Sequence, residues 1–88
     1  MLTHRFKNLN VKCGSTDILV NGLAHYSIEE YDESNEAIFE NVHIYDALDK
    51  SGFITSAECL GYIADAVLET LNKDHSLCRQ LGNNYTQK

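Results

Sequence analysis

Apolar and polar residues alternate along the first strand-like stretch of the chain. Leu9, Val11 and Cys13 are separated by single polar residues, which is the period-two pattern of a half-buried β-strand. Residues 14–17, Gly-Ser-Thr-Asp, then interrupt the alternation with turn-forming types. The pattern predicts a strand that ends near Cys13.

Two more apolar runs, residues 18–20 and 23–28, flank the pair Asn21-Gly22. An Asn-Gly pair between apolar runs is typical of a β-hairpin, because both central positions of a type I′ turn need a positive φ. We therefore expect a tight turn at Asn21-Gly22. An acidic connection over residues 29–35 should lead to a further strand over roughly residues 37–45, which is rich in β-favouring types.

The second half of the chain has helical spacing. Thr55 and Glu58 fit a capping box, in which each side chain hydrogen-bonds the other's backbone amide. A helix is expected from Ser56 to Asn72, and one or two further turns would end at Gly82 as a C-cap. Its apolar face recurs at three- and four-residue intervals and consists of Leu60, Ile63, Ala64, Val67, Leu68 and Leu71.

These elements predict an α+β fold with two layers. A small antiparallel sheet of about three strands would be covered by one long C-terminal amphipathic helix. The chain of 88 residues fits one domain over residues 1–82, followed by a polar C-terminal tail over residues 83–88.

The composition indicates in which compartment of the cell the protein is expected. The N-terminus lacks the apolar stretch of a secretory signal, and no window is apolar enough to predict a membrane span. Three widely spaced cysteines are poor material for a disulfide framework and suit a reducing compartment. We therefore expect a cytoplasmic protein with no membrane partner.

The charge is negative and unevenly distributed. The net charge is −6, and eight of the thirteen acidic residues lie between Ile28 and Lys50. The seven Lys and Arg residues are scattered, which disfavours direct binding of nucleic acid through its phosphates. The acidic stretch indicates either a solvated face or a surface that binds a protein partner with a basic surface.

Residues 49–58 resemble the second half of an EF-hand calcium loop. With Gly52 at the sixth position, Asp49 falls third, Ser51 fifth and Glu58 twelfth. The first position falls on Ala47, which has no side-chain oxygen. The alternative function is therefore a degenerate EF-hand-like domain with weak or absent calcium binding.

Other site chemistry has little support in the sequence. His75 and Cys78 stand three apart, but no Cys-x-x-Cys or His-x-x-x-His spacing accompanies them. His25 and Ser27 can share a strand face, but no oxyanion glycine or nucleophile elbow is present. We therefore expect no metal, no cofactor and no enzymatic activity.

The order of elements resembles small accessory proteins of phages and mobile elements. The resemblance lies in Val20-Asn21-Gly22, Tyr26-Ser27-Ile28-Glu29, Val42-His43-Ile44-Tyr45 and residues 63–69. It implies a non-enzymatic protein that binds, and inhibits, a host or defence complex. The expected partner-binding residues lie in the acidic connection and are Tyr26, Glu29, Glu30, Tyr31, Asp32, Glu33 and Glu36.

Overall fold

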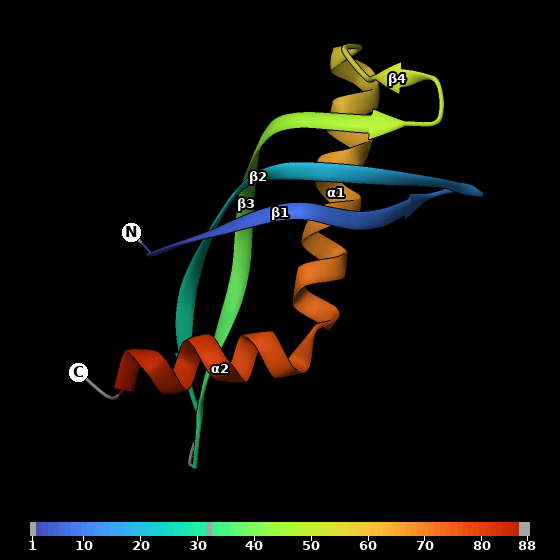
Figure 1. Ribbon diagram of the computed structural model, residues 1–88. Coiled ribbons are helices and arrows are strands. Elements are labelled where there is room, and N and C mark those ends of the chain that lie inside the picture. Colours follow the sequence, from blue (N-terminus) through green and yellow to red (C-terminus); the bar gives the residue numbers. More distant parts are fainter. Residues whose placement is uncertain (1, 32, 87–88) are drawn as a thin grey trace.

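The computed structural model describes residues 2–31 and 33–86. Four strands come first and two helices follow (Figure 1). The elements are β1 (Leu2–Cys13), β2 (Thr16–Glu30), β3 (Asn35–Asp49), β4 (Gly52–Phe53), α1 (Ala57–Lys73) and α2 (His75–Thr86).

The strands form one antiparallel sheet in the order β1-β2-β3-β4. The predicted α+β class is confirmed, with four strands in place of about three and two helices in place of one. Both β2 and β3 are 15 residues long, and Figure 1 shows them bending midway into a long hairpin. The helix α1 lies beside the part of the sheet near β4, and α2 crosses the far half of the hairpin.

The two faces of the sheet differ in what covers them. We call the face that carries Ile18, Val20 and Ala24 of β2 the inner face, because these residues are buried in the core with residues of both helices. Alternate residues of β2, such as Leu19, point to the opposite, outer face, since side chains alternate along a strand. The helix α1 presents Ile63, Val67 and Leu71 to the core, as the spacing of its apolar residues predicted.

The predicted turn at Asn21-Gly22 is wrong. Both residues lie inside β2, and the β1–β2 connection is at Gly14-Ser15. The pair marks irregularities in the sheet instead: the register with β3 shifts between Asn21 and Gly22, and the register with β1 shifts between Phe6 and Leu9.

Asn21 and Gly22 serve this irregular region in different ways. The Asn21 side chain accepts from the Asn8 amide at 2.8 Å and donates to Asp46 at 2.6 Å, so it links three strands. At Gly22 an added Cβ would lie 2.3 Å from the His43 carbonyl oxygen and 2.8 Å from the Phe6 ring. A glycine is required there by close packing rather than by a positive φ.

The helix ends also differ from expectation. The N-cap of α1 is Ser56, whose hydroxyl accepts from the Cys59 amide at 3.4 Å, so the Thr55–Glu58 capping box is not formed. Asp74 separates the two helices and caps α2 by accepting from the Leu77 amide. Gly82 lies inside α2 rather than at its end, and the helix continues through Thr86 into the segment expected as a tail.

Candidate protein-binding site

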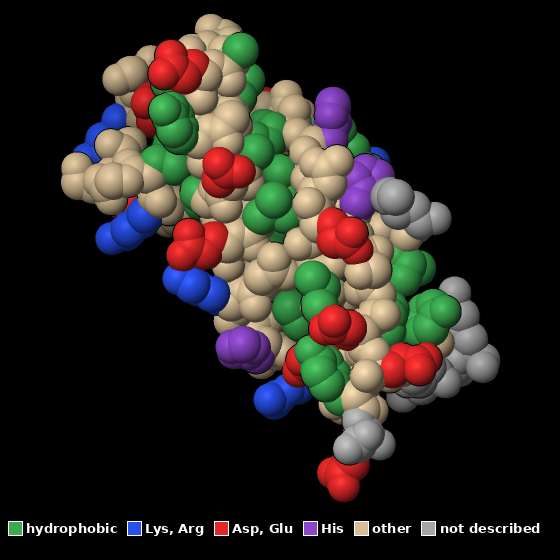
Figure 2. Space-filling view, turned by 180° about the vertical axis from the view of Figure 1, so that it is seen from behind, with side chains coloured by type: hydrophobic (Ala, Val, Ile, Leu, Met, Phe, Trp, Pro, Cys, Tyr) green, Lys and Arg blue, Asp and Glu red, His purple; other side chains and the backbone are tan. Residues whose placement is uncertain are grey.

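The acidic residues expected to bind a partner lie at the end of the β2–β3 hairpin. Residues 29–30 close β2 and residues 35–36 open β3. The Tyr31 amide donates to the Ser34 carbonyl at 2.7 Å, which closes the turn. Asp32 lies outside the described residues. Figure 2 shows acidic side chains around this lower end of the molecule.

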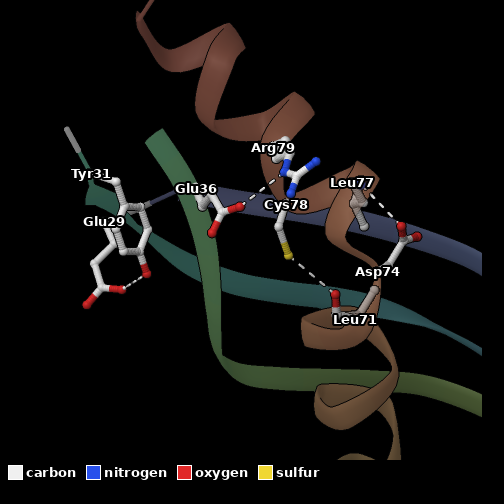
Figure 3. A network of polar contacts seen from close by, with 8 residues as sticks. All are labelled: Glu29, Tyr31, Glu36, Leu71, Asp74, Leu77, Cys78 and Arg79. Carbon is white, nitrogen blue, oxygen red and sulfur yellow. Dashed lines mark hydrogen bonds and ion pairs between the residues drawn. The ribbon is translucent and has the colours of Figure 1, made fainter. Parts of the chain in front are cut away.

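Glu29 and Tyr31 interact with each other at the hairpin end (Figure 3). The Tyr31 hydroxyl donates to the Glu29 carboxylate at 2.8 Å, although the Tyr31 side chain is exposed. This hydrogen bond, together with the negative charge of Glu29, holds the pKa of the Tyr31 phenol above its usual range. The contact orients an aromatic ring beside the carboxylates.

Glu36 has a structural contact that the sequence did not reveal. Its carboxylate pairs with the Arg79 guanidinium of α2 at 3.3 Å, and its side chain is only 27 % exposed (Figure 3). Tyr26 is also partly buried, and its ring packs against Phe39 of the inner face with 5.5 Å between centroids. Tyr26 and Glu36 are therefore anchored to the fold, whereas Glu29, Glu30 and Glu33 are exposed.

A hollow of about 850 Å³ adjoins the hairpin end. Its apolar lining includes Leu2 of β1, Ile28 of β2 and Tyr85 of α2, and its carboxylates are Glu30 and Glu40. Sequence reasoning missed the hollow, because its walls come from four elements that are distant in the chain. Glu40 belongs to the acidic stretch found in the sequence, and the structure places it, exposed, at a register shift of β3 on the wall of the hollow.

His25 also lines this hollow. Its Nδ1 atom is buried and has no hydrogen-bond partner among the described residues. A buried nitrogen without a partner is uncommon in folded proteins. Because this nitrogen is itself buried, a bound molecule could reach it only if the wall of the hollow moved.

The segment that resembles a calcium loop forms the β3–β4 turn. The Asp49 carboxylate accepts from the Ser51 amide at 2.7 Å, which is a local turn contact. The preceding segment is the strand β3 rather than the entering helix of an EF-hand. Within residues 2–31 and 33–86, no group of three or more His, Cys, Asp or Glu side chains is placed to hold a metal ion.

The three cysteines are free and lie in different environments. Cys59 is exposed, Cys13 is half-buried, and Cys78 is buried in the core. Burial raises the pKa of the Cys78 thiol, which donates to the Leu71 carbonyl at 3.5 Å (Figure 3). Cys78 is therefore a core residue that joins α2 to α1, and its chemistry suits packing rather than nucleophilic attack.

Neither helix in the described part of the chain is long and apolar enough to cross a membrane. Comparisons with protein-family models, curated proteins and solved structures found no match to this chain.

Proposed function

We propose that this protein is a non-enzymatic binding domain whose hairpin end and adjoining hollow bind a protein partner with a basic surface. The observation that carries the proposal is that exposed carboxylates and an apolar hollow occur together at one end of the molecule. The carboxylates of Glu29 and Glu33 are exposed at the hairpin end, and those of Glu30 and Glu40 line an apolar hollow large enough for a side chain of the partner.

Acidic side chains outnumber basic ones at the hairpin end. Among the described residues, Arg79 is the base that pairs with the hairpin, and its partner is Glu36. The remaining carboxylates would attract Lys and Arg side chains and accelerate encounter with a basic surface. The hollow would then add desolvated apolar contact, which charge alone does not provide.

The rest of the fold holds this end in place. Arg79 of α2 forms an ion pair with Glu36 of the hairpin, and Tyr26 packs on Phe39 of the inner face. A surface that is ordered before binding loses less entropy when the partner docks. The resemblance to phage and mobile-element accessory proteins suggests one specific form of this function, in which the domain inhibits a host or defence complex by occupying its basic surface.

The test compares two charge-reversed variants of equal charge. One carries Glu30→Lys and Glu40→Lys, at the hollow. The matched control carries Glu58→Lys and Asp65→Lys, on the exposed side of α1. A partner captured by crosslinking with the wild-type protein is purified, and its association rate is measured for all three proteins.

We expect the hollow variant to associate about tenfold more slowly, because long-range attraction governs the encounter rate, whereas the control stays within about twofold. The wild-type rate should also fall as salt rises toward about 0.5 M. Equal rates for the wild type and the hollow variant would move the binding surface elsewhere. Unchanged far-UV circular dichroism confirms that each variant is folded.

A further inference from the structure

The outer face of the sheet carries a row of apolar side chains at the end near β4. The strand register pairs Asn10 with Leu19, Leu19 with Leu48, and Leu48 with Phe53, so the apolar row lies on β2, β3 and β4 and ends beside the polar Asn10 of β1. Leu19 is 40 % exposed, Leu48 37 % and Phe53 71 %. We call Leu19, Leu48 and Phe53 the outer row.

The outer row is extended by Tyr45, which is 49 % exposed at a register shift in β3. The Arg5 guanidinium lies 5.9 Å from the centroid of the Tyr45 ring, so this ring lies over the outer face. Both helices pack against the inner face, and among the described residues no element covers the outer row. Exposed apolar side chains that lie next to one another on neighbouring strands are a candidate interaction surface.

The charges around the outer row differ from those elsewhere on the molecule. The outer face also carries two bases, Arg5 and Lys12, and two acids, Asp17 and Asp46. Lys12 lies opposite Asp17 in the strand register. The hairpin end and the exposed side of α1 are acidic instead. Two copies of a chain with a net charge of −6 would repel each other at those acidic surfaces but not at the outer row.

We propose that the outer row binds a second copy of this chain and forms a two-fold symmetric dimer through the outer faces of the two sheets. A two-fold axis along the strands, between β2 and β3, reverses the row over itself. Leu19 of one copy then lies over Leu48 of the other, and Phe53 lies over Asn10 of β1. The two leucines therefore pack on each other across the axis, as an isologous interface requires, and each Phe53 covers the Asn10 position of the other copy.

This arrangement fits ordinary sheet packing. Two sheets that stack face to face lie about 10 Å apart, and their side chains interdigitate between them. The hairpin end and its hollow stay outside the interface, so the dimer would present two copies of the proposed binding end. The dimer does not depend on that function, and either proposal can fail alone.

The test is the molar mass in solution over a range of protein concentrations, by sedimentation equilibrium. We expect the wild-type protein to be mostly dimeric at about 500 µM, which corresponds to a dissociation constant of about 100 µM or tighter. The double variant Leu48→Ser and Phe53→Ser should weaken dimerisation at least tenfold. The single variant Phe53→Ser, which changes the most exposed side chain of the row, should weaken it severalfold without affecting folding.

The matched control is Tyr62→Ser, because Tyr62 is an aromatic residue with 65 % exposure on α1, outside the sheet. It should leave the dimerisation constant unchanged. Dimerisation through apolar contact should also persist at about 0.5 M salt, where association through opposite charges weakens. A wild-type protein that stays monomeric at about 500 µM would overturn the proposal, as would equal weakening by Phe53→Ser and Tyr62→Ser.

Discussion

At the scale of single residues, Gly22 is a position at which the packing of neighbouring strands leaves no room for a side chain. An alanine at this position would bring its Cβ against the His43 carbonyl oxygen and the Phe6 ring, so β2 and β3 would have to separate. We expect Gly22→Ala to lower the free energy of unfolding by about 3 kcal/mol, measured by urea denaturation. The matched control is Gly61→Ala on the exposed side of α1, where an added Cβ meets no atom within 4 Å.

Gly61→Ala should instead raise the free energy of unfolding by about 0.5–1 kcal/mol, because alanine restricts the unfolded chain and favours the helix. The two substitutions are chemically identical and should act in opposite directions. A loss below about 1 kcal/mol for Gly22→Ala would contradict the close approach of the two strands at this point.

His4 gives the fold a predictable pH dependence. Its ring lies 5.9 Å from the Phe39 ring, and burial lowers the pKa of the His4 imidazole below its ordinary value of 6.5. The unfolded chain therefore binds this proton at a higher pH than the folded chain does. The stabilising contribution is fully present above pH 6.5 and is lost as the pH falls through the lower folded pKa.

We expect the wild-type free energy of unfolding to fall more steeply than that of His4→Phe as the pH is lowered from 6.5. The phenylalanine keeps an aromatic ring at the site and removes the titrating group. Urea denaturation at a series of pH values measures both slopes. Parallel curves for the two proteins would show that His4 does not contribute to the acid sensitivity.

At the scale of elements, a single side chain links α1 to the open edge of β3. The Asn72 amide accepts from the Phe39 amide at 2.8 Å and donates to the Phe39 carbonyl at 3.0 Å. These are the two hydrogen bonds that a neighbouring strand would make, so Asn72 satisfies one position of an edge strand. The contact also fixes the end of α1 over the bend of the hairpin.

We expect Asn72→Ala to lower the free energy of unfolding by about 1–3 kcal/mol, because it leaves two part-buried backbone groups of Phe39 without partners. Hydrogen exchange of the Phe39 amide should accelerate more than that of amides in the middle of β2. Asn41→Ala, at an exposed position of β3 outside the outer row, is the control and should change stability by less than about 0.5 kcal/mol. An unaltered Phe39 exchange rate would contradict the role of Asn72.

The elements differ in how well the sequence predicts them, for a physical reason. The apolar face of α1 depends on local spacing, so Ile63, Val67 and Leu71 could be assigned to the core correctly. Asn21-Gly22 has the local signature of a turn, but its role depends on Phe6 and His43, which are distant in sequence. Close approach between strands that are distant in sequence has no local sequence signature, so it could not be predicted from the sequence.

At the scale of the whole molecule, the same limit applies to the candidate site. The acidic residues of the hairpin end are consecutive enough to be found in the sequence. The hollow beside them, the Arg79–Glu36 pair and the outer row arise only when distant elements meet. The sequence therefore indicates an acidic end of the molecule. The structure adds two apolar surfaces, the hollow and the outer row, which can give a specificity that charge alone does not provide.

The order of the elements also has a consequence for biosynthesis. All four strands precede both helices in the chain, so a ribosome that adds about 5–20 residues per second completes the sheet seconds before α2 is available to cover it. During that interval the inner face, with Val20, Phe39 and Ala47, is exposed to water. We therefore expect a chain that ends before α2 to aggregate more readily than the full chain, because its inner face stays uncovered.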